Sequence, residues 1–167
     1  MAYRNKTYVA FDADSDIRYY RLMTAWKQSD YSEFNFCNAH DLTNIWQYSS
    51  EETIKRSLRE RLLNTKIFVL LVGEKTKFLY KFVKWEIEQA IKLDLPIIVV
   101  NLNGIRQIDN NNCPAILRDK LALHISFNNK ILQKSLEEWA DIHSKYKREG
   151  KSGPFHYNQL TYKGLGL

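Results

Sequence analysis

The chain has 167 residues, of which 44% are apolar and 26% are charged. These values are close to the averages of globular proteins and the length suits one domain, so a disordered chain is excluded. Two cysteines are too few for a disulfide framework, and no C-x-x-C pair is present to bind zinc. The formal net charge of +6 makes nucleic-acid binding a class to be weighed.

Two features favour a cytoplasmic protein without a membrane partner. The N-terminal residues lack the apolar stretch of a signal peptide. The longest apolar run covers residues 67–72, far short of the roughly 20 residues that cross a bilayer.

Basic residues occur singly over most of the chain, and no DNA- or RNA-binding motif is present, so we expect no nucleic-acid partner.

The first half of the chain predicts two strands and two helices. A strand over residues 7–11 leads into three carboxylates and a helix over residues 16–29. An alternating stretch at residues 33–37 predicts an edge strand. Ser49 and Glu52 form a capping box before a helix that places Ile54, Leu58 and Leu62 on one face.

The second half predicts three strands and two further helices. Uniformly apolar residues at 66–72 and 96–100 indicate strands buried on both faces, and a fifth strand is expected over residues 121–127. Helices are expected over residues 78–93 and 131–146. The alternation, with a helix after every strand, predicts a doubly wound α/β fold. Five parallel strands in the flavodoxin-like order 2-1-3-4-5 would form its central sheet, and helices on both faces would complete a three-layer sandwich. Residues 1–147 are the expected domain, and residues 148–167 a C-terminal tail that is docked or mobile.

The first loop at the carboxyl end of the predicted sheet carries Asp12, Asp14 and Asp16. These carboxylates are suited to a divalent cation or ribose hydroxyls, and equally to the start of a helix, where Asp residues cap the backbone. The capping interpretation is the stronger one for Asp14 and Asp16, and the two are evenly balanced for Asp12. Neither G-x-G-x-x-G nor a P-loop motif is present, which excludes ordinary dinucleotide oxidoreductases and P-loop hydrolases.

The loop after the second strand contains Cys37, Asn38, His40 and Asp41. A nearby Cys and His can form a nucleophilic pair, but a buried thiol and a loop histidine explain the same residues more simply. Asn38 and Asp41 are suited either to a polar ligand or to a turn.

Glu86 is the most informative charged residue, because its helical neighbours at positions 82, 83 and 90 are apolar. A carboxylate at the border of a core face is costly unless it has a partner or a task. The simple interpretation pairs Glu86 with Lys81 or Lys84. The functional one notes that its helix follows the third strand and overlooks the predicted crevice.

Three segments together resemble a TIR domain, and most closely the compact prokaryotic TIR-like proteins that include the TIR subunit of Thoeris anti-phage defence. They are the strand that ends at Phe11-Asp12, the strand over residues 67–72, and the sequence Phe82-Val-Lys-Trp-Glu86. The resemblance covers about residues 5–127. The usual TIR pattern begins with Trp and ends with Glu, so Phe82 departs from it while Glu86 matches.

The resemblance implies a flavodoxin-like fold and cleavage of the nicotinamide–ribose bond of NAD, which is a substrate and not a cofactor. Glu86 would be the catalytic residue, because a preorganised carboxylate stabilises the positive charge that develops on the sugar. No metal is expected. The residues expected to bind the substrate are Phe11, Asp12, Asp14, Asn38, Trp46, Phe82 and Trp85.

For the partners, the resemblance implies a cyclic ADP-ribose-type signal, a separate effector that responds to it, self-association into a homo-oligomer and a phage-derived trigger. The surplus of basic residues near the C-terminus would have a modest role in steering the pyrophosphate of NAD. The alternative function is a non-catalytic TIR-like module that scaffolds signalling partners.

Overall fold

The computed structural model describes residues 6–29, 35–38, 49–79 and 81–167. Their central feature is a parallel sheet in the order β2-β1-β3-β4-β5-β6. The first five strands follow the predicted order 2-1-3-4-5, but the sheet has six strands where five were expected. The strands are β1 (Lys6–Ala10), β2 (Asn35–Asn38), β3 (Ile67–Val72), β4 (Ile97–Asn101), β5 (Ala122–Ser126) and β6 (Pro154–His156).

The central strands are buried along their whole length. Every residue of β3 and β4 is buried, which explains why these segments are apolar without alternation. The strands lie in register with their neighbours, so that Val9 pairs with Val69 and Val69 pairs with Ile98. Burial on both faces therefore confirms the prediction of a sheet covered by helices.

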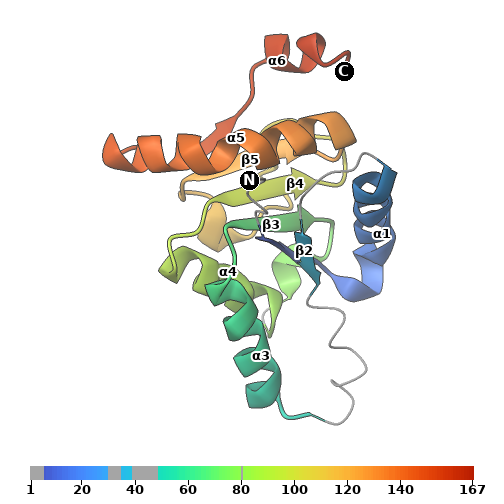
Figure 1. Cartoon of the computed structure of the whole chain (residues 1–167), viewed down its shortest axis with the longest axis vertical. Coiled ribbons are helices and arrows are strands. Elements are labelled where there is room, and N and C mark those ends of the chain that lie inside the picture. The colour runs from blue at the N-terminus through green and yellow to red at the C-terminus, as the bar shows by residue number, and fades with distance from the viewer. Residues whose placement is uncertain (1–5, 30–34, 39–48, 80) are drawn as a thin grey trace.

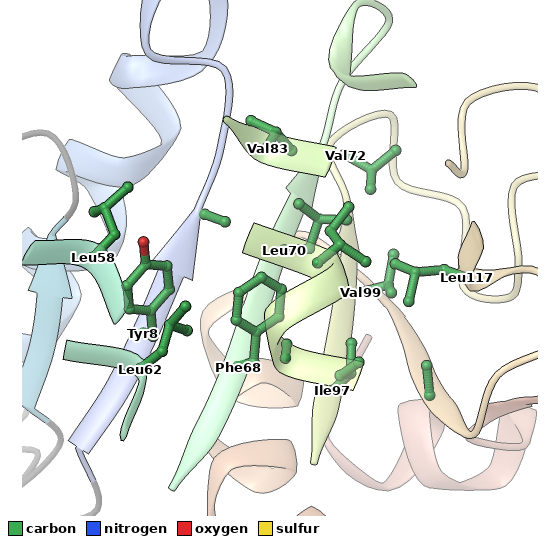
Figure 2. Close-up of a cluster of buried hydrophobic side chains, with 14 of the residues drawn as sticks. Tyr8, Leu58, Leu62, Phe68, Leu70, Val72, Val83, Ile97, Val99 and Leu117 are labelled. Carbon is green, nitrogen blue, oxygen red and sulfur yellow. The ribbon is translucent and has the colours of Figure 1, made fainter. Parts of the chain in front are cut away.

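Two apolar clusters, one on each face of the sheet, make the fold a three-layer sandwich. One joins the sheet to α3 (Glu51–Leu63) and α4 (Val83–Lys92), and we refer to it as the α3/α4 cluster. The other joins the opposite face to α1 (Ala13–Ser29) and α5 (Asn129–Arg148), and we refer to it as the α1/α5 cluster. Figure 1 shows α5 on one side of the sheet and α3 and α4 on the other. In Figure 2, Tyr8 of β1 lies beside Leu58 and Leu62 of α3.

Several predicted helix boundaries are wrong by a few residues. The cap of α3 is Ser50, whose side chain accepts a hydrogen bond from the Thr53 backbone N–H, and not Ser49. The helix expected over residues 78–93 is replaced by a short 3-10 turn, η2 (Thr76–Phe78), followed by α4. Between β4 and β5 the only helical residues form η3 (Ala115–Leu117), a 3-10 turn, so the predicted helix after the fourth strand is absent from residues 102–121.

The C-terminal segment adds an edge strand and a short helix. Strand β6 pairs with β5 from Ala122↔Pro154 to His124↔His156. Helix α6 (Gln159–Gly164) buries the ring of Tyr162 completely in the α1/α5 cluster. The Tyr162 hydroxyl accepts a hydrogen bond from the backbone N–H of Ser126 at 3.3 Å. These contacts dock the segment, and the boundary drawn at residue 147 stays a prediction.

Candidate active site

The candidate site is built around Glu86, in the first turn of α4. The residue is only 3% exposed, and its helical neighbours Val83 and Ile87 belong to the α3/α4 cluster. Its Oε2 atom is buried and has no partner of good hydrogen-bond geometry among the described residues. A carboxyl group is therefore enclosed by apolar side chains, where the charged form loses most of its solvation.

Neither nearby lysine neutralises Glu86. Lys81 Nζ lies 3.6 Å from Glu51 Oε2 on α3, and Lys84 Nζ lies 3.9 Å from Glu88 Oε1, one turn along α4. The interpretation that paired Glu86 with Lys81 or Lys84 is therefore wrong.

Burial raises the pKa of Glu86 from its ordinary value of 4.5 to about 7. The hydroxyl group of Tyr8 acts on the carboxyl group as a hydrogen-bond donor and opposes this rise, but burial has the larger effect. The group therefore changes its charge near neutral pH, which is typical of carboxyl groups at functional sites.

Tyr8 is a site residue that the sequence reasoning missed. It lies on β1, is fully buried, and stacks on Phe68 of β3 with ring centroids 5.6 Å apart. A tyrosine within a strand buried on both faces needs a partner for its hydroxyl group, and this was the available signal.

Phe82 and Trp85 precede Glu86 in sequence, and both pack against the α3/α4 cluster. Phe82 is the N-cap residue of α4, and its carbonyl oxygen accepts the Glu86 backbone N–H at 2.8 Å. Two cations of α3 contact the ring of Trp85, with Lys55 Nζ and the guanidinium carbon of Arg59 each 5.6 Å from its centroid. Trp85 therefore ties α4 to α3, and its role in substrate binding stays a prediction.

Phe11, Asp12 and Asp14 surround the start of α1. The Phe11 ring stacks on Tyr20 at 4.9 Å within the α1/α5 cluster, on the face of the sheet opposite α4. Asp12 Oδ1 accepts the backbone N–H groups of Asp14 and Ser15 at 3.1 and 3.4 Å, so Asp12 performs the capping role. Asp14 is exposed in the first turn. Contact of these three residues with a substrate stays a prediction.

The remaining predicted site residues lie outside what is described. Trp46, His40 and Asp41 fall in residues 39–48, and only the backbone of Cys37 and Asn38 is described, at the end of β2. Over the described residues, no group of three or more His, Cys, Asp or Glu side chains could hold a metal ion. The described helices also include none with the length and apolarity needed to cross a membrane.

A parallel sheet of this order, with helices on both faces, is a doubly wound α/β domain of the flavodoxin-like kind. The family model described as Thoeris protein ThsB, TIR-like domain, matches residues 8–107, and the chain belongs to this family. A search of curated proteins found no match. Membership implies a place in anti-phage defence and a signalling partner.

Proposed function

We propose that the protein cleaves the nicotinamide–ribose bond of NAD and that Glu86 is the catalytic residue. The observation that carries this proposal is the buried carboxyl group of Glu86, which neither Lys81 nor Lys84 neutralises. Membership in a TIR-like family supports the choice of NAD as the substrate.

The catalytic role of Glu86 follows from the charge that the reaction creates. When the bond between the ribose C1′ and the pyridinium nitrogen breaks, its electron pair leaves with neutral nicotinamide and positive charge remains on the sugar. An ionised carboxylate in an apolar environment stabilises that charge more strongly than it would in water. The leaving group needs no proton, so Glu86 acts in its ionised form.

The product depends on which nucleophile then reaches C1′. Attack by water gives ADP-ribose and releases one proton. Attack by a hydroxyl group or a ring nitrogen of the same molecule gives a cyclic product. When a hydroxyl group attacks, it also releases one proton. A site that excludes water favours cyclisation. We propose a cyclic ADP-ribose-type signal, because the family acts through a signalling partner.

The burial of Glu86 also favours a second candidate function. With 3% of the residue exposed, a substrate reaches the carboxyl group only after the surrounding residues move. A protein that never opens this site would act as a scaffold for signalling partners. Self-association or a phage-derived trigger would supply the opening that the enzymatic proposal requires.

An assay of NAD products separates the two functions. Wild type, Glu86→Gln and Glu88→Gln are incubated with NAD at high protein concentration and in extracts of infected cells, and the nucleotides are analysed by mass spectrometry. Glu88 is the matched control, because it is exposed on the same helix. We expect nicotinamide and an ADP-ribose product from wild type and Glu88→Gln, and a loss of about a hundredfold or more in Glu86→Gln.

Two outcomes would count against the proposal. If wild type releases no nicotinamide in either setting, the scaffold function is favoured. If Glu86→Gln is as active as wild type, the assignment of Glu86 is wrong.

A further inference from the structure

A cavity lies at the carboxyl end of the sheet, where the chain leaves β1 and β3. Its volume is about 420 Å³, within the roughly 300–1,000 Å³ of small-molecule sites. It is lined by residues from the start of α1 and from the loops after β3 and β4. In open α/β sheets ligands bind at this edge, beside the point where strand order reverses, which in this sheet lies between β1 and β3. Glu86, Phe82 and Trp85 are not among its lining residues.

Asp16 is the buried polar group of this cavity. It is 7% exposed, and its Oδ2 atom has no hydrogen-bond partner among the described residues. An acceptor that is buried without a partner is costly. Because Asp16 is itself a lining residue of the cavity, its carboxyl group is the buried acceptor that a ligand there would meet. Burial raises the pKa of Asp16, and the charge of Asp12 adds to the rise.

The carboxyl group of Asp16 is accommodated because Gly73 has no side chain. A Cβ atom at Gly73 would lie 2.5 Å from Asp16 Oδ2 and 2.8 Å from Asp16 Oδ1, closer than any real contact allows. The Gly73 N–H donates to Thr76 Oγ1 at 2.9 Å, which fixes the loop after β3. The loop is therefore shaped around the carboxyl group.

A second buried carboxylate, Asp109, holds two asparagines that line the cavity. Asp109 is 3% exposed, and its Oδ2 accepts the side-chain amides of Asn103 and Asn112, both at 2.9 Å. Burial alone would raise the pKa of Asp109, but hydrogen bonds from Asn112, Asn111 and Asn103 outweigh it and hold the pKa below its usual range. Because Asn103 and Asn112 line the cavity, this network gives it a preorganised polar wall.

Cations lie at the rim of the cavity. Arg18 and Lys75 both line it and are exposed, and each lowers the pKa of Asp16 through its charge. The Arg18 guanidinium is held over the ring of Tyr19, 4.8 Å from its centroid, and donates to the Tyr19 hydroxyl at 3.2 Å. Glu74 adds one carboxylate to the same rim.

This arrangement selects a ligand with two different ends. A simple anion would leave Asp16 without a donor, and a simple cation would be repelled by Arg18 and Lys75. A hydroxyl group can donate to a carboxylate or exchange hydrogen bonds with a neutral carboxyl group, so it suits Asp16 in either state. A phosphate group suits the arginine and lysine at the rim.

We propose that this cavity binds a phosphorylated sugar, with a sugar hydroxyl on Asp16 and the phosphate on Arg18 and Lys75. The site goes beyond the proposed cleavage of NAD, because it does not involve Glu86.

The test measures binding of ribose 5-phosphate, ribose, inorganic phosphate and serine by calorimetry, and locates binding by amide NMR shifts. Ribose 5-phosphate should bind about tenfold more tightly than ribose or phosphate, and should shift the amides of Gly73 and Asn103. Asp16→Asn should lower the affinity for ribose 5-phosphate about tenfold and leave phosphate binding unchanged. Arg18→Gln should lower the affinity for both ribose 5-phosphate and phosphate. Arg21 is an exposed cation of α1 outside the cavity, so Arg21→Gln should leave both affinities unchanged.

Three results would overturn the proposal: no binding of ribose 5-phosphate, amide shifts confined to other regions, or tighter binding of serine. An affinity that neither Asp16→Asn nor Arg18→Gln changes would also overturn it. If Asp16→Asn does not fold, the comparison of Arg18→Gln with Arg21→Gln still tests the proposal. Glu86→Gln should bind ribose 5-phosphate as wild type does, so failure of NAD cleavage and failure of this site are separate outcomes.

Discussion

The hydroxyl group of Tyr8 on β1 holds the pKa of the buried carboxyl group of Glu86 on α4 below the value that burial alone would give it. The two residues are 78 positions apart in sequence, and the sandwich of sheet and helix brings them together. Donation to a carboxylate favours its charged form, whereas burial disfavours it. The charge state of Glu86 is therefore set by two opposing effects of known sign.

Removal of the Tyr8 hydroxyl should raise the pKa of Glu86 above about 7. In Tyr8→Phe the donor is lost while the ring and its stacking on Phe68 are kept, so only burial acts on the carboxyl group. The pKa is measured by NMR titration of protein labelled with ¹³C at the glutamate carboxyl carbon. Tyr20→Phe, on the opposite face of the sheet, is the control. An unchanged pKa in Tyr8→Phe would show that the hydroxyl does not act on Glu86.

The buried carboxyl group should also make stability depend on pH. Between its unfolded pKa of 4.5 and its folded pKa of about 7, Glu86 binds more protons in the folded state, so the free energy of unfolding falls as pH rises. The gap corresponds to about 3 kcal/mol. Glu86→Gln has no carboxyl group at this position, so its free energy of unfolding should not fall in this way. The difference between the variant and wild type should therefore shift in favour of the variant by about 3 kcal/mol from pH 4 to pH 8. Urea unfolding at several pH values measures it, and Glu88→Gln should show no such trend. An equal pH dependence of Glu86→Gln and wild type would contradict the raised pKa.

Gly73→Ala should destabilise the protein by about 1–3 kcal/mol, because the new methyl group would overlap the Asp16 carboxyl group. Gly164→Ala is a matched control, because a Cβ at Gly164 meets nothing within 4 Å. The two variants are compared by denaturant unfolding. Equal stability of both would show that Asp16 can move away from Gly73 at little cost.

The thiol of Cys113 should react slowly with alkylating reagents in the folded protein. Cys113 is fully buried, and burial raises its pKa to about 11, so about one thiol in a thousand is ionised at pH 8. In a Cys37→Ser background, labelling followed by mass spectrometry should show modification only when urea unfolds the chain. Rapid labelling in the absence of urea would contradict the burial of Cys113.

Much of the fold could be predicted because local patterns carry it. The apolar runs of β3 and β4 indicate burial on both faces, and both strands lie within one residue of their predicted limits. The cap of α3 was misplaced by one residue because Ser49 and Ser50 are both good caps, and only backbone geometry selects Ser50. Strand β6 was missed because its three residues have no alternating pattern of their own. Its place depends on pairing with β5 and on the packing of Phe155 against Trp139 and Tyr146.

The candidate site could be predicted only in part. The apolar neighbours of Glu86 on its own helix indicate a special carboxyl group. The partners of Lys81 and Lys84, by contrast, depend on where α3 lies and on which turn of α4 each side chain reaches. The same holds for Asp12 and Asp16: both are acidic residues near a helix start, but only packing shows that one caps α1 and the other faces Gly73.

The most direct test of the central claim is the pH dependence of nicotinamide release from NAD. If the ionised carboxylate of Glu86 stabilises the transition state, kcat/KM should rise about tenfold per pH unit below pH 7 and level off above it. Glu86→Gln should lose the activity at every pH. A rate that does not change between pH 5 and pH 8, or that survives in Glu86→Gln, would contradict the claim that Glu86 is the catalytic group.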